Sequence, residues 1–202
     1  MTMSARPISG AEPLDPSAAA AAGWSDEEVR WEFLAERAAV HAVAGRLDEA
    51  MPLWAEALYL ARTSFAANDP RLSASIANHA YALRLGGGAA LASDLFREAL
   101  GVWDASLPWI AGLRIERRAR SSLFHLRMEA KHWKTYEATA RKRLAAFAAE
   151  GRAAVAALAE DRPAGSRGLA RWWPEKSPTF TDGRKLLAAV LLVVRTDEVG
   201  TG

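Results

Sequence analysis

Residues 45–58 read GRLDEAMPLWAEAL and residues 87–100 read GGAALASDLFREAL, and the two stretches align at a spacing of 42 residues. The chemistry of the side chain is kept at six pairs of positions. These are Ala38 and Ala80, Gly45 and Gly87, Ala50 and Ala92, Trp54 and Phe96, Ala57 and Ala99, and Leu58 and Leu100. A fixed period of this size is typical of stacked helical hairpins. The sequence therefore predicts an all-α fold, an α–α superhelix of about three hairpins followed by C-terminal helices.

Capping residues and glycines set the predicted boundaries. Ser25 and Glu28 form a capping box, and Asp69 with Pro70 is typical of a helix start. The predicted helices span residues 26–44, 47–66, 70–85, 89–105, 109–130 and 133–150, with an alanine-rich helix continuing to about residue 160. Pro108 is expected to end the second hairpin. The third hairpin matches the period only loosely.

These boundaries divide the chain into three regions. Residues 1–23, rich in Ala, Pro, Ser and Gly, are expected to be a disordered tail without the organisation of a signal peptide. Residues 24–161 form the repeat domain. Residues 162–202 combine a loop rich in Pro, Gly and Trp with a short apolar helix over residues 186–194, for which no pairing strand is apparent.

Charge is unevenly distributed, although the chain has a net charge of only +2. Residues 1–109 carry 8 basic and 14 acidic side chains, whereas residues 110–152 carry 11 basic and 4 acidic ones. Such asymmetry can steer an oppositely charged partner, or it can be a solvated arginine-rich surface. The chain has no cysteine, which excludes disulfides and thiolate chemistry and fits a cytoplasmic location. No apolar run reaches the length of a membrane span.

The repeated segments resemble the second helix of the tetratricopeptide repeat. The residues that show the resemblance are 45–50, Trp54, Ala57 and Leu58 in the first unit, and Ala92 and 96–100 in the second. The family's basic period is 34 residues. The 42-residue spacing, with Asn68, Asp69 and Pro70 between the units, is similar to the longer repeat of kinesin light chain. The resemblance covers about residues 29–150 and implies a fold rather than cargo transport.

The resemblance also implies a site. Arrays of this family bind extended peptides in a concave groove lined by the first helix of each hairpin, and Asn78 matches the groove asparagine. The residues implied at the groove are Asn78, Tyr81, Arg84, Arg114, Arg118, Ser121 and His125. Guanidinium groups suit carboxylate recognition, so an acidic or C-terminal peptide is the expected ligand. Glu36 and Ala39 lie at groove positions of the first unit and do not complete a carboxylate clamp. An alternative that stays open is that the groove holds the chain's own tail, namely the segment that contains Trp172 and Trp173.

Other classes of function have less support. His41, His79, His125 and His132 show no metal-ligand spacing, and no serine has a nucleophile context, so we expect neither an enzyme nor a metal or other cofactor. The basic region over residues 114–143 leaves nucleic-acid binding as an alternative. The leading interpretation is a protein-binding scaffold, adaptor or assembly chaperone. Its partner is a protein or peptide rather than a membrane, and a homo-oligomer stays open.

Overall fold

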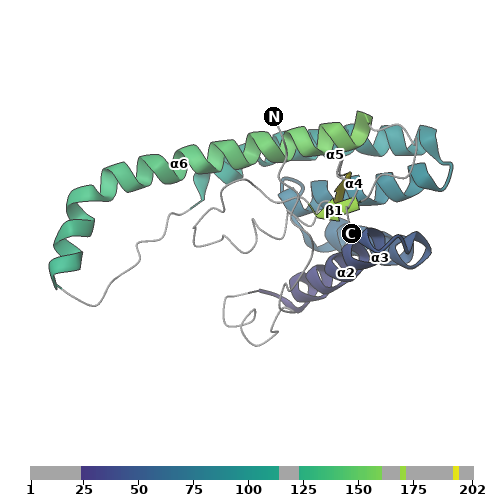
Figure 1. The fold of residues 1–202 in the computed structure, drawn as a ribbon, viewed down its shortest axis with the longest axis horizontal. Coiled ribbons are helices and arrows are strands. Elements are labelled where there is room, and N and C mark those ends of the chain that lie inside the picture. The colour runs from purple at the N-terminus through teal and green to yellow at the C-terminus, as the bar shows by residue number, and fades with distance from the viewer. Residues whose placement is uncertain (1–23, 114–122, 161–168, 172–192, 196–202) are drawn as a thin grey trace, which may run out of the picture.

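The computed structural model describes residues 24–113, 123–160, 169–171 and 193–195 (Figure 1). Five helices make up almost all of this part of the chain, so the all-α prediction is confirmed. They are α2 (Asp26–Val43), α3 (Leu47–Ser64), α4 (Pro70–Leu85), α5 (Ala89–Gly112) and α6 (Leu123–Glu160). Two short strands follow, β1 (Leu169–Arg171) and β2 (Val193–Arg195). The predicted tail over residues 1–23 lies outside the described residues.

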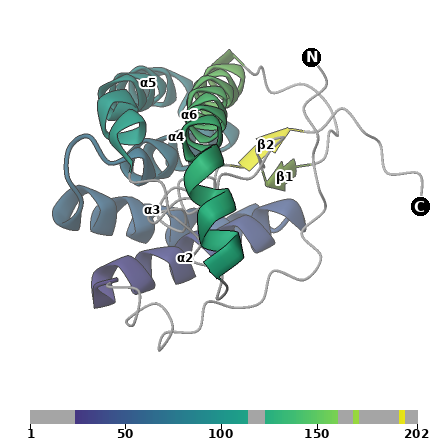
Figure 2. The same cartoon turned by 90° about the vertical axis from the view of Figure 1, so that its left-hand side faces the viewer.

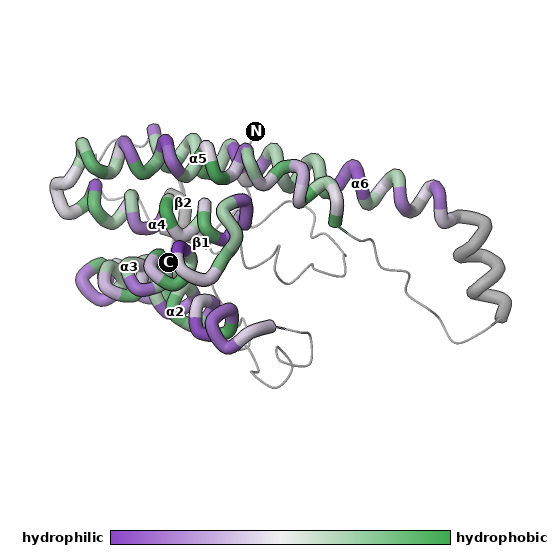
Figure 3. The backbone as a smooth tube through the Cα atoms, turned by 180° about the vertical axis from the view of Figure 1, so that it is seen from behind, coloured by the Kyte–Doolittle hydropathy of each residue, from purple (hydrophilic) through white to green (hydrophobic). Residues whose placement is uncertain are grey.

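The first four helices form two stacked hairpins. Helix α2 packs along α3, helix α4 packs along α5, and α3 of the first hairpin contacts α4 of the second. Figures 1, 2 and 3 show the two pairs lying one above the other, with α6 against the second pair. The chain order of the helices is therefore also their order in the stack.

Each repeated residue takes the same place in both hairpins. Ala38, Ala50, Ala80 and Ala92 are completely buried, which allows the helices of a hairpin to approach closely. Trp54 and Phe96 are both buried where the larger side chain was expected, and Ala57 and Ala99 are buried likewise. Residues that align at the 42-residue spacing therefore occupy equivalent places in the two hairpins.

The two hairpin turns are also alike in their hydrogen bonds. Gly45 has φ +76° and Gly87 has φ +89°, the left-handed region that glycine adopts without strain. The amide of Arg46 donates to the carbonyl of His41, and the amide of Gly88 donates to that of Leu83. This i to i−5 bond after a left-handed residue is the Schellman motif of helix ends.

Two helix starts follow the predicted capping. The amide of Glu28 donates to Ser25 Oγ at 3.2 Å, and the amide of Ser25 donates to Glu28 Oε2 at 2.9 Å, which completes the capping box. Asp69 caps α4 by accepting from the amide of Arg71 at 2.9 Å, with Pro70 in the first turn.

A buried arginine joins these two helix starts. Arg71 Nη1 lies 2.8 Å from Glu28 Oε1, and Arg71 Nη2 lies 2.6 Å from Asp69 Oδ2. Its guanidinium carbon lies 3.9 Å from the centre of the Phe65 ring and within 6 Å of two indoles, those of Trp24 and Trp31. Burial lowers the pKa of Arg71, but the hydrogen bonds and negative charges of Asp69 and Glu28 raise it more, so the net shift is upward.

Pro108 does not end the second hairpin. Helix α5 continues through Pro108 to Gly112, so the expected end near residue 105 was wrong. Ile110 and Leu113, both beyond the proline, are buried in the main core, as is Trp103 before it. The apolar burial on both sides of Pro108 offsets the backbone hydrogen bond that proline removes.

The predicted third hairpin is also wrong. Residues 109–112 belong to α5, and α6 is one continuous helix of 38 residues with no turn near residue 131. No glycine or proline interrupts residues 123–150, so nothing in the local sequence breaks the helix. Helix α6 packs on α5 and α4, the place that the first helix of a third hairpin would take, and its N-terminal part projects beyond the stack (Figure 1).

A glycine fixes the contact between α5 and α6. A Cβ added to Gly151 would lie 2.1 Å from Cζ2 of Trp103, so only glycine leaves room for the indole. The indole Nε1 of Trp103 donates to the carbonyl of Ala148 at 3.0 Å, one turn before this glycine. The Trp103 ring also packs against Phe147, with 6.2 Å between ring centres.

The strands form a small antiparallel ribbon, with Leu169 opposite Arg195 and Arg171 opposite Val193. Val193 and Val194 are therefore in a strand rather than at the end of a helix over residues 186–194, and residues 186–192 lie outside the described part. The pairing strand that the sequence did not reveal is Leu169–Arg171, a segment of only three residues whose partner lies more than twenty positions away.

We predict that Arg71→Met lowers the free energy of unfolding by about 3–5 kcal/mol, because the nearly buried carboxylates of Glu28 and Asp69 would keep their charges without a counter-charge. Urea denaturation of the full chain measures this. The matched control is Arg97→Met, whose exposed pair with Asp94 at 2.8 Å should contribute less than about 1 kcal/mol. Equal losses in the two variants would contradict the role assigned to Arg71.

We predict that Gly151→Ala lowers the free energy of unfolding by about 1–3 kcal/mol, although alanine is the better helix former, because the added methyl group collides with Trp103. Gly101→Ala in α5 is the control, since an added Cβ there meets no atom of the described residues within 4 Å. That control should be stabilised by about 0.5–1 kcal/mol. Urea denaturation compares both, and a stabilised Gly151→Ala chain would refute the proposed fit.

Candidate partner-binding site

The structure describes three of the seven predicted site residues in full. Asn78, Tyr81 and Arg84 follow one another along α4 at intervals of one turn, as the resemblance implied. Arg114, Arg118 and Ser121 lie outside the described residues. His125 is in the first turns of α6, but its side chain is outside the described part.

Asn78 and Tyr81 are not open to a partner in this structure. Asn78 is 2% exposed and Tyr81 is 4% exposed, and Tyr81 belongs to the main hydrophobic core. A groove asparagine that contacts a ligand backbone has to be reached by that ligand. In this structure a ligand reaches these two side chains only if the residues that cover them move, so the contacts implied at Asn78 and Tyr81 stay a prediction.

Arg84 binds the end of α6. Its Nη1 donates to the carbonyl of Leu158 at 2.8 Å, and its Nη2 donates to the carbonyl of Ala159 at 2.7 Å. The last carbonyls of a helix have no partner within the helix and carry partial negative charge, so a guanidinium group stabilises them. The guanidinium carbon also lies 4.3 Å from the centre of the Phe96 ring. Arg84 thus holds two backbone carbonyls of its own chain.

The first hairpin's groove positions are covered as well. Ala39 is completely buried in an alanine-rich cluster with Trp54, and Glu36 is half-buried. Strands β1 and β2 both lie against α2, and β2 also lies against α6, so the ribbon bridges the first helices of the array (Figure 2). The chain's own C-terminal region therefore occupies the side on which a partner peptide was expected. Trp172 and Trp173 lie outside the described residues.

The sequence held a signal for this coverage that was not used. Phe147, Ala154, Val155 and Leu158 are buried, and they recur at helical spacing through the alanine-rich stretch after residue 144. This apolar face predicts a helix that packs on the array. The predicted boundaries placed a helix end at residue 150 with an alanine-rich helix continuing to about residue 160, whereas α6 is one helix through Gly151.

Two features of the described residues bear on metal binding and acid–base chemistry. No group of three His, Asp or Glu side chains among them could hold a metal ion. His79 has a buried Nδ1 without a hydrogen-bond partner in the described part of the chain. Burial lowers the pKa of His79, and the positive charge of Arg62 lowers it further.

Comparison of the chain with protein-family models, with curated proteins and with solved structures finds no match. Within the described residues, none of the helices combines the length and the apolar character needed to cross a bilayer. The tetratricopeptide resemblance thus rests on the repeated residues and on the two hairpins they form.

We predict that the free energy of unfolding falls as the pH is lowered through about 6.5, because the unfolded chain then binds a proton that folded His79 resists. The loss should be complete once the pH is below the lowered pKa of the folded state. Urea midpoints between about pH 7.5 and 5.5 would show the slope, and His79→Gln should flatten it. The same slope in both proteins would assign the effect to other groups.

Proposed function

We propose that this chain is a non-catalytic protein-interaction scaffold, an adaptor or assembly chaperone built as a short tetratricopeptide-like array. The observation that carries the proposal is the stacking of two hairpins whose contact residues repeat at 42 positions, which aligns α2 and α4 on one side. Arrays of helical hairpins use that side as an extended binding surface. The lack of cysteine supports a cytoplasmic location.

A peptide bound on this side has to compete with the chain itself. The end of α6 is held there by two hydrogen bonds from Arg84, and the ribbon lies across α2. When only a fraction of the molecules has this side uncovered, the apparent affinity equals the intrinsic affinity multiplied by that fraction. We therefore propose regulated binding, in which the partner displaces the part of the C-terminal region that Arg84 holds in place.

The basic surface of α6 favours nucleic-acid binding as a second candidate. Lys134, Lys142 and Arg143 are exposed on this helix. Two further arginines are already engaged within the chain, since Arg141 donates to carbonyls at the end of α5 and Arg152 pairs with Asp104 at 2.7 Å. Trp133 is packed against the core rather than presented for base stacking. These contacts make protein binding the better-supported function.

We predict that Arg84→Gln raises the apparent affinity for an authentic groove partner by roughly 3- to 10-fold, because the end of α6 is released more often. The partner would first be found by proximity labelling in the native host and then purified. Isothermal titration of wild type and variant measures the change.

Arg97→Gln is the matched control, since Arg97 is an exposed arginine of α5 that pairs only with Asp94 among the described residues. Its affinity should stay within about 2-fold of wild type. An affinity that falls 10-fold with Arg84→Gln would mean that Arg84 contacts the partner without gating it. An unchanged affinity would move the binding site away from this side of the array.

A further inference from the structure

The last two helices leave an apolar groove between them. Its walls come from the C-terminal part of α5 and the middle of α6, and its volume is about 500 Å³. The apolar lining is Leu107, Ile110, Ala111, Leu144, Ala145, Ala148 and Ala149. Arg141 and Arg152 lie at its two ends. An apolar surface of this kind, rimmed by charged groups, is typical of an interaction site.

The position of the groove follows from the repeat. Helix α2 is paired along its length with α3, and α4 with α5, whereas the main contacts of α6 in the described part of the chain are with the preceding hairpin and the ribbon. A second helix beside α6 would complete a third hairpin. The exposed alanines Ala145 and Ala149 would let such a helix approach closely, as Ala50 does in the first hairpin.

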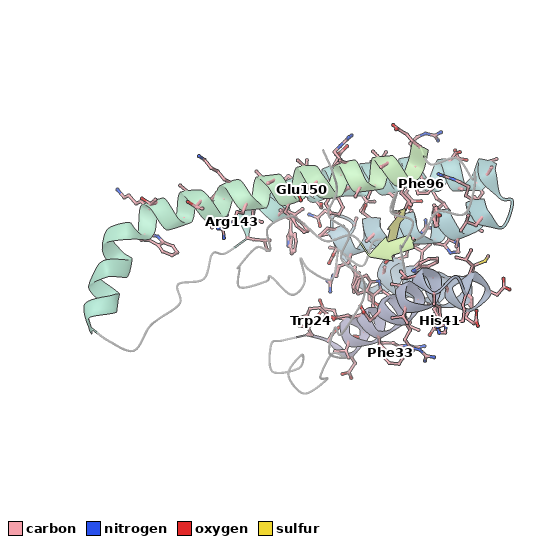
Figure 4. The ribbon with its side chains drawn as sticks, viewed as in Figure 1. Trp24, Phe33, His41, Phe96, Arg143 and Glu150 are labelled. Carbon is pink, nitrogen blue, oxygen red and sulfur yellow. The ribbon has the colours of Figure 1, made fainter. Side chains whose placement is uncertain are left out.

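The other end of the stack exposes a complementary face on α2. Phe33 is 56% exposed and Val40 is 42% exposed, two turns apart on the same side of the helix. Figure 4 shows Phe33 pointing away from the rest of the stack, on the side of α2 opposite to α6. Two large apolar side chains on one helix face are unusual for a terminal repeat, which normally carries a polar outer face.

The 42-residue register shows what this face is suited to contact. The positions equivalent to Phe33 and Val40 in the second hairpin are Ser75 and Ala82. Ser75 Oγ accepts a hydrogen bond from the indole of Trp31 at 2.8 Å, and Ala82 packs in a cluster with alanines of α2. In the second hairpin this face thus rests on the hairpin before it. On α2 the same face is free to rest on a helical surface from another molecule.

The charges of the two ends are opposite. The first hairpin, residues 24–65, carries eight acidic and four basic side chains. The segment over residues 110–152, which includes one wall of the groove, carries 11 basic and 4 acidic ones. On α2, Asp26 lies two turns before Phe33 on the same side, and Arg30 is paired with Glu56. The guanidinium carbon of Arg37 lies 5.3 Å from the centre of the Phe33 ring, so the acidic excess belongs to the hairpin as a whole rather than to the ring's immediate surroundings.

We propose that a second copy of this chain docks the Phe33–Val40 face of its α2 into the groove between α5 and α6. Opposite charge orients the two copies, and apolar burial of Phe33 and Val40 stabilises the contact. The two surfaces lie at opposite ends of one molecule, so the contact is head-to-tail. Such a contact does not close on itself after two copies and leads to longer open assemblies. This inference does not depend on the proposed scaffold function.

The experiment uses the full 202-residue chain and two blocked variants. Phe33→Asp combined with Val40→Asp blocks the α2 face, and Ala145→Arg combined with Ala149→Arg blocks the groove. All four positions are exposed, so both variants should fold, which circular dichroism checks. Sedimentation velocity between about 5 and 200 μM should show mass that grows with concentration for wild type and association that weakens with salt.

Each blocked variant alone should associate at least 10-fold more weakly than wild type. Mixed together, the two variants should form a one-to-one dimer that does not grow, because each supplies the surface the other lacks. Leu91→Asp, an equally exposed leucine near the start of α5, is the control and should assemble like wild type. A wild-type chain that stays monomeric overturns the proposal and leaves the groove to another occupant. The proposal is also overturned if both blocked variants still form the dimers seen with wild type, or if the mixture of the two variants forms no complex.

Discussion

Arg71 is the point at which the ends of three helices meet, and the first half of the structure depends on it. Its guanidinium group contacts Glu28 of α2 and the Asp69 cap of α4, and it lies over the ring of Phe65 at the end of α3. A buried charge is costly to desolvate unless its hydrogen bonds are made. Glu28 closes the capping box of α2 with its other oxygen, so one carboxylate ties the start of that helix to the start of the next hairpin.

A second constraint governs the other half of the structure. Trp103 of α5 reaches into the space left by Gly151 and donates to the backbone of α6, which fixes the position of the long helix along its axis. Arg84 then holds the last carbonyls of α6 against α4. Both contacts involve the backbone of α6, and its buried side chains Leu144, Phe147 and Val155 add apolar packing on the main core. The helix covers the α4 side of the array by the same geometry.

These two constraints define which surfaces a partner can reach. The side lined by α2 and α4 is covered by the chain's own C-terminal region, whereas the groove between α5 and α6 and the Phe33 face of α2 are accessible. Under the proposed scaffold function, a partner on the α2 and α4 side competes with a contact that is always nearby, which gives control over binding. The acidic and basic ends add a direction to any association of copies.

The sequence by itself determined the two hairpins, because the signals that define them are local. Gly45 and Gly87 allow a left-handed backbone in the turns, and Ser25 and Asp69 cap helices. The alanines at 38, 50, 80 and 92 mark where the two helices of a hairpin approach closely. It also placed Asn78, Tyr81 and Arg84 on one helix face. Only the tertiary structure decided what lies on that face. Pro108 and Gly151 look like helix ends, but the burial of Ile110 and the ring of Trp103 keep both helices intact. The strand at Val193–Arg195 exists only through its pairing with residues 169–171. Contacts between distant segments supply those energies, and no local pattern records them for Pro108 or for the strand.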